Sequence, residues 1–106
     1  IVAATRIIKE VEYFEYREII NKFKEKIKIN HHAYFRLNQM QRKVYKAEAL
    51  IKMLSEDKPA LIGIQKNQNY AVFFRNKQGH LRLMFKTNKN NIEIITFYIT
   101  EKIPKI

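Results

Sequence analysis

Apolar residues near the start of the chain recur at helical spacing, and they predict one helix from Arg6 to about Lys26. This helix would carry two apolar stripes, the first formed by Ile7, Val11 and Phe14, and the second by Tyr16, Ile19, Ile20, Phe23 and Ile27. At 100° per residue the stripes lie on roughly opposite sides of a helix. The helix therefore either bends near residues 13–16 or turns its first stripe toward another surface, such as a partner chain.

The next segment predicts a short strand followed by two helices. Residues 27–29 alternate between apolar and polar, as a short strand does. A second helix follows Asn30, a favourable N-cap residue. Its core stripe comprises Ala33, Leu37, Met40 and Val44. A third helix covers about Lys46 to Ser55, and Pro59 prevents its continuation.

After Pro59 the apolar positions alternate with a period of two residues, which predicts strands. The four predicted strands are Ala60–Lys66, Tyr70–Arg75, His80–Thr87 and Ile92–Thr100. The links between them are short and rich in asparagine, whose side chain tolerates the left-handed backbone conformation of turns. Links of this length join antiparallel neighbours.

The predicted fold is therefore α+β, with N-terminal helices packed on one face of a C-terminal antiparallel four-stranded meander. A short extra strand is expected near residues 27–29. The length of 106 residues predicts a single domain over residues 1–106. Within it, residues 1–26 would form the N-terminal helix and residues 27–106 the core of the domain.

The two faces of the meander differ in polarity if Arg75 lies opposite His80 and Thr87 lies opposite Ile92. The face expected under the helices comprises Tyr70, Val72, Phe74, Leu81, Leu83, Phe85, Ile94, Thr96 and Tyr98. The other face comprises Phe73, Arg75, Arg82, Met84, Lys86, Glu93, Ile95 and Phe97. This second face suits RNA, because its cations can meet phosphates and its rings can stack on exposed bases. The alternative is an ordinary solvated face on which long cationic side chains cover apolar atoms.

Composition narrows the function classes. Lys and Arg number 21 and Asp and Glu number 10, which gives a formal net charge of +11 and attracts polyanions such as nucleic acid or an acidic protein. A lysine-rich surface that serves only solubility is the alternative. The absence of cysteine excludes a disulfide scaffold, a thiol nucleophile and cysteine-bound metals. Two glycines are too few for a phosphate-binding glycine loop, and no apolar run is long enough to span a membrane.

The candidate chemistry centres on His32 and Arg36, which stand one helical turn apart at the start of the second predicted helix. An imidazole there can move protons near neutral pH, and a guanidinium can stabilise charge on a phosphate. The alternatives are a helix-start histidine packed at the edge of the core and an Arg36 salt bridge to Glu48 or Glu93. Three histidines without suitably spaced carboxylates make a weak case for a metal site.

The stretch from Ile29 to Tyr98 resembles the small ribonuclease toxins of the barnase–EndoU–colicin–RelE group, and within it a family of short domains of largely uncharacterised function. The family has a His-Ala-x-x-Arg motif, here His32-Ala33-Tyr34-Phe35-Arg36, and a last strand of the Ile-Thr-x-Tyr type, here Ile95-Thr96-Phe97-Tyr98. The order of the elements also matches. The basic pair Arg42-Lys43 comes about two residues later than in the family and lacks the following glycine, so no role is carried onto Arg42.

The resemblance implies a metal-independent endoribonuclease toxin without a cofactor, which uses the RNA 2′-hydroxyl as nucleophile and leaves a cyclic phosphate. His32 would be the general base or acid, Arg36 would bind phosphate, and Thr96 and Tyr98 would position phosphate or shuttle a proton. The residues expected to bind RNA are Lys43, Arg75, Arg82 and Lys86. The predicted register leaves Thr96 and Tyr98 on the face opposite Arg82, unless a β-bulge in the last hairpin reverses one set or both residues reach the site at the sheet edge.

The expected partners are an RNA substrate and an acidic antitoxin or immunity protein. The enzyme would act in the cytoplasm, either as a toxin–antitoxin member or delivered there as the C-terminal part of a secreted toxin. Two other function classes stay open. One is a basic nucleic-acid-binding module without catalysis, and the other is an interaction domain that docks a partner on Ile7, Val11 and Phe14.

Overall fold

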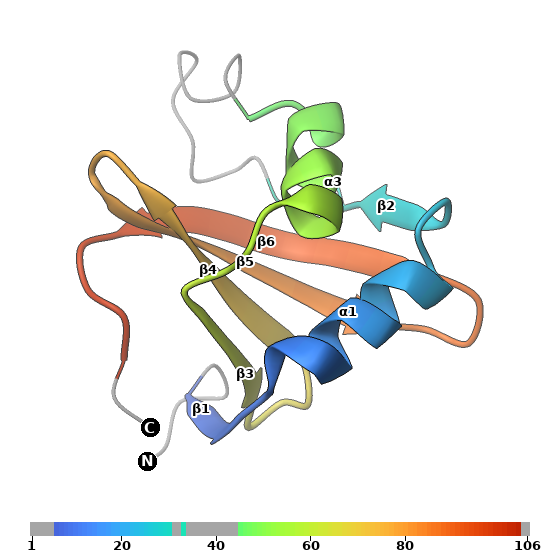
Figure 1. Cartoon of the computed structure of the whole chain (residues 1–106), viewed down its shortest axis with the longest axis horizontal. Coiled ribbons are helices and arrows are strands. Elements are labelled where there is room, and N and C mark those ends of the chain that lie inside the picture. Colours follow the sequence, from blue (N-terminus) through green and yellow to red (C-terminus); the bar gives the residue numbers. More distant parts are fainter. Residues whose placement is uncertain (1–5, 31–32, 34–44, 105–106) are drawn as a thin grey trace.

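A computed structural model describes residues 6–30, 33 and 45–104 (Figure 1). In chain order its elements are β1 (Ile7–Glu10), α1 (Tyr13–Lys22), β2 (Ile27–Ile29), α3 (Ala47–Glu56), β3 (Leu61–Gln65), β4 (Tyr70–Asn76), β5 (Gly79–Thr87) and β6 (Ile92–Thr100). The predicted α+β class is confirmed. The third predicted helix and the four strands after Pro59 are found within one or two residues of their expected bounds.

The strands form one sheet of six, in the order β1-β3-β4-β5-β6-β2. The predicted four-stranded meander is its centre, and both Arg75↔His80 and Thr87↔Ile92 pair as expected. Two strands extend the meander, since β1 pairs antiparallel with β3 and β2 pairs parallel with β6. The short strand predicted at residues 27–29 is therefore real, and it closes one edge of the sheet.

The predicted helix from Arg6 to Lys26 is wrong in its first half. Residues 7–10 form strand β1, and α1 begins only at Tyr13. Pairing with β3 explains the difference, because Ile7 and Val11 then enter the interior with exposed fractions of 8% and 4%. The stripe proposed for partner docking does not form, since only Phe14 of its three residues is exposed.

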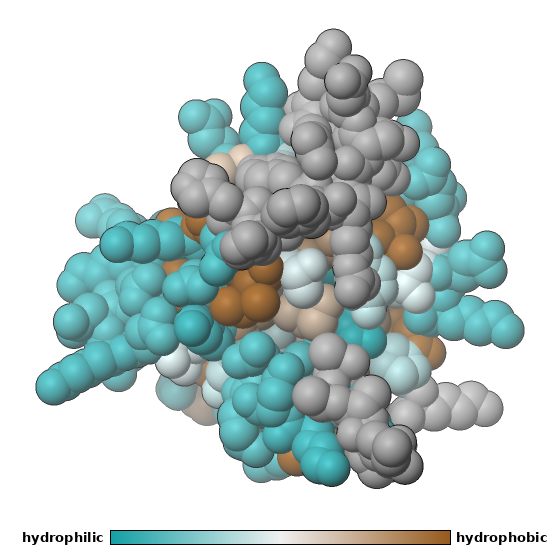
Figure 2. Space-filling view, turned by 180° about the vertical axis from the view of Figure 1, so that it is seen from behind, coloured by the Kyte–Doolittle hydropathy of each residue, from teal (hydrophilic) through white to brown (hydrophobic). Residues whose placement is uncertain are grey.

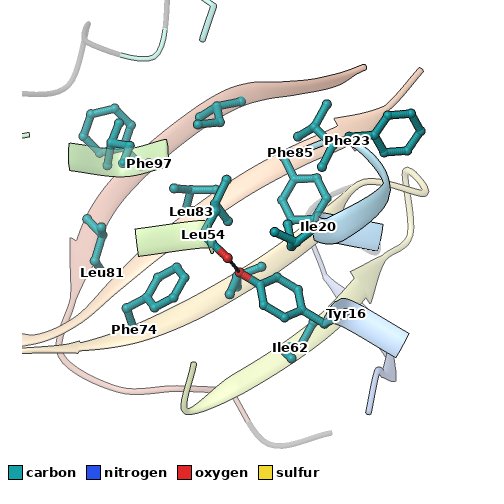
Figure 3. Packing of buried hydrophobic residues seen from close by; sticks show 14 of the residues in the cluster. Tyr16, Ile20, Phe23, Leu54, Ile62, Phe74, Leu81, Leu83, Phe85 and Phe97 are labelled. Carbon is teal, nitrogen blue, oxygen red and sulfur yellow. Dashed lines mark hydrogen bonds between the residues drawn. The ribbon is translucent and has the colours of Figure 1, made fainter. Parts of the chain in front are cut away.

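Both helices lie on the same face of the sheet (Figure 1). Their apolar sides and the facing strands make one core, in which Tyr16, Ile20 and Leu54 are fully buried (Figure 3). Leu50 of α3 is also fully buried. The helices are also tied by hydrogen bonds. The Tyr16 hydroxyl donates to the Leu54 carbonyl over 2.7 Å, and Arg17 donates to the Ser55 carbonyl. Side chains of α1 thus satisfy two backbone oxygens in the last turn of α3, which a helix end leaves without helical partners.

The hairpin turns use asparagine differently from the prediction. The one non-glycine residue with positive φ in the described part is Gln68, at 72°, rather than an asparagine. Asn67 and Asn76 instead accept hydrogen bonds from backbone N–H groups two residues later, over 3.0 and 2.9 Å. Such side-chain bonds replace backbone turn contacts. Gly79 supplies the positive φ of the β4–β5 hairpin, at 126°.

The second predicted helix falls mostly outside the described residues. Of its core stripe only Ala33 is described, and it is fully buried in the main core.

Candidate nucleic-acid interface

A β-bulge in β6 decides which side chains share the sheet face turned away from α1 and α3, here called the far face. Met84 pairs with Thr96, whereas the next residue, Phe85, pairs with Ile94, so Ile95 is the extra residue. An extra residue shifts the alternation of a strand by one position. Beyond the bulge, Phe97 joins the helix-side core, and Tyr98 packs with Phe73 and Met84 on the far face.

The predicted faces are therefore correct up to Ile94 and wrong beyond it. Thr96 and Tyr98 were placed under the helices and Phe97 on the cationic face, and the bulge exchanges them. The sequence left two ways for Thr96 and Tyr98 to reach the cations, a β-bulge or a position at the sheet edge. The structure has the β-bulge. Arg82 now pairs directly with Tyr98 across the two strands.

Arg82 lies at the centre of the far face, and Phe73, Tyr98 and Gln65 contact its guanidinium. Its guanidinium carbon is 5.2 Å from the centre of the Phe73 ring and 5.9 Å from that of the Tyr98 ring. Its Nη2 donates to Gln65 Oε1 over 2.7 Å. The arrangement fixes a guanidinium, a group suited to phosphate, beside two aromatic rings.

Gln65 is the residue of this site that sequence reasoning missed. It is fully buried, yet its side chain ends in a polar amide, and both atoms of that amide form hydrogen bonds. The amide nitrogen donates to Asn67 Oδ1 over 3.1 Å, while the oxygen accepts from Arg82. A buried polar side chain is placed by its hydrogen bonds, so the β3–β4 turn fixes Gln65, and Gln65 fixes Arg82. A glutamine at the end of a predicted strand gave no signal of this role.

One end of the far face carries Arg75 and His80, which pair across β4 and β5. Arg75 is exposed, whereas His80 is half-buried and lies two residues before Arg82 on the same strand. Nδ1 of His80 is buried, and it has no hydrogen-bond partner among the described residues. The pairing therefore places the His80 imidazole on the same face as Arg82.

The other end of the far face carries a row of three charged residues. Lys86 on β5 pairs with Glu93 on β6, and Glu93 pairs with Lys28 on β2. Glu93 accepts a hydrogen bond from the Asn30 amide over 3.2 Å. The far face thus has cations at both ends and an arginine between aromatic rings at its centre.

Figure 2 shows the molecule from behind the sheet as seen in Figure 1, with apolar residues visible between gatherings of hydrophilic ones. Five of the predicted site residues share the far face: Arg75, Arg82, Lys86, Thr96 and Tyr98. The other three, His32, Arg36 and Lys43, lie outside the described residues. The structure therefore places the sheet half of the predicted site and leaves the helix half as a prediction.

The tyrosines with shifted acidity belong to the other side of the sheet. Burial raises the pKa of Tyr16 and of Tyr70, and both side chains pack in the helix-side core. Tyr70 stacks on Phe85 with ring centres 5.0 Å apart. These rings stabilise the fold and do not reach the far face.

The described part of the chain also has hollows away from the far face. Two shallow hollows of about 340 and 290 Å³ lie elsewhere, one at the end of α1 and one between β1 and Pro59. Residues 6–30, 33 and 45–104 contain no cluster of three potential metal ligands. Neither of their helices is long and apolar enough to cross a membrane.

Comparison with known proteins adds no relative: no family model matches the chain, nor does any curated protein or any solved structure.

Proposed function

We propose that this protein is a metal-independent endoribonuclease that holds RNA against the far face of its sheet. The observation that carries the proposal is the bulge at Ile95, which puts Thr96 and Tyr98 on the same face as Arg82. Hydroxyl groups and a guanidinium on one surface are the groups that bind and orient a phosphodiester. The net charge of +11 and the half-buried ring of Tyr98, on which a base can stack, favour an RNA strand as the ligand.

The proposed reaction is an internal transfer of the phosphodiester. A general base, assigned to His32 by the family resemblance, removes the proton from the 2′-hydroxyl. The 2′ oxygen then bonds to phosphorus while the bond from phosphorus to the 5′ oxygen breaks, and a general acid protonates the leaving oxygen. The products are a 2′,3′-cyclic phosphate and a 5′-hydroxyl end. The substrate supplies the nucleophile, so the step consumes neither water nor a cofactor.

The remaining side chains serve positioning. Arg36 would bind the reacting phosphate and stabilise its developing charge. Thr96 and Tyr98 would orient the phosphate or relay a proton, and the cations Lys43, Arg75, Arg82 and Lys86 would follow the RNA backbone. Such an enzyme would cleave the RNA of the cell that produces it. The proposal therefore includes an acidic antitoxin or immunity protein that binds the enzyme.

The test is cleavage of a labelled RNA in the presence of EDTA, with the product ends identified. Wild type is expected to yield cyclic phosphate ends, and an RNA with 2′-deoxyribose at the cleaved position should stay intact. Tyr98→Phe and Thr96→Val should slow cleavage about tenfold or more, as expected when a group acting in proton transfer or charge stabilisation is lost. Tyr13→Phe, a hydroxyl deletion on the helix side, is the matched control and should cleave like wild type. Intact RNA with wild type would end the proposal.

A second comparison identifies the imidazole that acts. His32→Ala and His80→Ala are assayed side by side, since His80 also lies on the far face. The assignment from the resemblance predicts that His32→Ala abolishes cleavage and that His80→Ala retains most of it. Cleavage unaffected by His32→Ala contradicts that assignment.

A nucleic-acid-binding module without catalysis is the second candidate. The observation that favours it is that Arg82, fixed by Gln65 and two rings, needs no histidine to bind a phosphate strand. Binding that weakens steeply with added salt, together with an absence of cleavage products, would select this function over the nuclease.

A further inference from the structure

Six lysines gather where the end of α1 meets β2 and the β5–β6 turn, a region called here the lysine corner. Its members are Lys22, Lys24, Lys26, Lys28, Lys86 and Lys89. The corner is held together by the backbone, because the Ile92 N–H donates to the Lys26 carbonyl over 2.9 Å and β2 pairs with β6. Figure 1 shows the turn after α1 beside the β5–β6 turn.

The corner is strongly cationic and its charges are accessible. Five of the six lysines are exposed, and Lys86 is half-buried. The only carboxylates on the same segments are those of Glu25 and Glu93. Within the described part of the chain, none of the six lysines forms an ion pair. Like charges this close raise the local potential, and a polyanion relieves it.

The surroundings of these lysines favour a phosphate backbone over an acidic protein. The exposed large apolar residues of the described part are Ile8, Tyr13, Phe14 and Ile103, and none belongs to the corner. Stable protein interfaces usually contain a buried aromatic or aliphatic anchor, which this region lacks. It presents asparagine side chains instead, at positions 21, 88, 90 and 91, and amide groups bond well to phosphate oxygens.

The corner also continues the far face. Lys86 lies four residues along β5 from Arg82, a span of about 13 Å at the rise of a strand. Lys28 lies across Glu93 from Lys86 on the edge strand. Figure 2 shows hydrophilic side chains gathered over this end of the sheet, on the left of the view. An RNA strand that is bound at Arg82 and extends along β5 would therefore reach the lysine corner.

We propose that the lysine corner is a second phosphate-binding region, which holds the part of an RNA strand that extends beyond the far face. The inference rests on the proposed function for its substrate class. It adds that binding depends on RNA length, and that the added affinity is electrostatic and independent of base sequence.

The test measures binding of 2′-O-methyl RNA, which lacks the attacking hydroxyl, at several salt concentrations. The corner variant carries Lys24→Gln, Lys26→Gln and Lys28→Gln. The control carries Lys9→Gln, Lys52→Gln and Lys58→Gln, three exposed lysines on β1, on α3 and in the loop after α3. Strand β1 is the sheet edge opposite β2. Both lose three charges, so they separate the corner from net charge alone.

The corner variant should bind a 12-nucleotide strand at least tenfold more weakly than wild type at low salt. The slope of log affinity against log salt should fall by about 2, the value for three lost phosphate contacts to a single strand. The control should change affinity by less than about threefold. A second variant with arginine at the same three corner positions should bind like wild type, since it keeps the charge.

A dinucleotide is too short to reach from Arg82 to the corner, so its cleavage should be equal in wild type and in the corner variant. Equal losses of 12-nucleotide binding in the corner and control variants would overturn the inference while leaving the nuclease intact. Loss of dinucleotide cleavage in the corner variant would overturn it as well. Wild type that neither binds nor cleaves RNA would overturn the proposed function, and the inference with it.

Discussion

Removal of one buried hydroxyl should measure how firmly the helix layer is attached. The Tyr16 side chain is fully buried, and its hydroxyl donates to the Leu54 carbonyl in the last turn of α3 (Figure 3). Tyr16→Phe keeps the ring and its packing and removes only the donor. The Leu54 oxygen then loses its bond from α1 in an environment that offers little access to water.

The expected cost follows from that geometry. Loss of one partner from a buried hydrogen bond costs about 1–3 kcal/mol, because the remaining group keeps its desolvation penalty. We expect about 2 kcal/mol for Tyr16→Phe, since the bond is short and both groups are buried. A domain of this size has about 5–15 kcal/mol of stability, so the variant should still fold. Its melting temperature should fall by roughly 8–16 °C.

Urea unfolding followed by far-UV circular dichroism measures this cost, because the chain has no tryptophan. Tyr13→Phe is the matched control in the same helix. The Tyr13 side chain is 37% exposed, and no hydrogen bond of its hydroxyl occurs among the described residues. Removal of the Tyr13 hydroxyl should change the free energy of unfolding by less than about 0.5 kcal/mol. Equal unfolding midpoints for Tyr16→Phe and wild type would refute the role given to this bond.

The same residue predicts a pH dependence. Burial raises the pKa of Tyr16 above the ordinary value of 10.0. Above pH 10 the unfolded chain loses the Tyr16 proton, whereas the folded protein keeps it. The contribution of this group to the free energy of unfolding is therefore fully present below pH 10 and decreases as the pH rises further. The loss approaches about 1.4 kcal/mol per pH unit in wild type. Tyr16→Phe lacks it, so the stability gap between the two proteins should narrow above pH 10. Parallel curves up to pH 11 would contradict this prediction.

Two further changes test the sheet. Gly63→Ala would place a methyl group 2.5 Å from Ile7 Cγ2, so the Ile7 side chain or strand β1 must shift. We expect a loss of about 1–3 kcal/mol in urea unfolding, and an unchanged midpoint would contradict the packing of β1 on β3. Deletion of Ile95 removes the bulge residue and leaves Phe97 inside and Tyr98 on the far face, so the protein should fold and retain RNA binding. Deletion of Leu83, which turns one half of β5 over, should unfold it. If deletion of Ile95 destabilises the fold as much as deletion of Leu83, Ile95 is not the extra residue of the bulge.

The second half of the fold was predictable because its signals are local. Strands β3, β4 and β5 end at asparagine-containing turns, so their bounds and the register of β4 on β5 follow from neighbouring residues. Strand β1 had no such signal. Residues 7–10 are few, and what makes them a strand is pairing with β3, more than fifty residues later in the sequence. The helical spacing of Ile7, Val11 and Phe14 was the only local pattern in this segment, and it predicted a helix.

The candidate site was predictable in composition but not in arrangement. The cations of β4 and β5 follow from strict alternation, and they lie on the expected face. From Ile94 to Tyr98 strand β6 contains no charged residue, so no charge marks where the alternation shifts. Gln65 escaped notice for a related reason. Its role depends on the position of Arg82, a contact that no local pattern encodes.

The most direct test of the account is to locate bound RNA on the protein. Wild type labelled with ¹⁵N and ¹³C is titrated with 2′-O-methyl RNA, and chemical shift changes are followed by NMR. We predict the largest changes at Arg82, Thr96 and Tyr98, with Lys86 and the corner lysines next, and little change along α3. Changes concentrated on α1 and α3, with the far face undisturbed, would contradict the account.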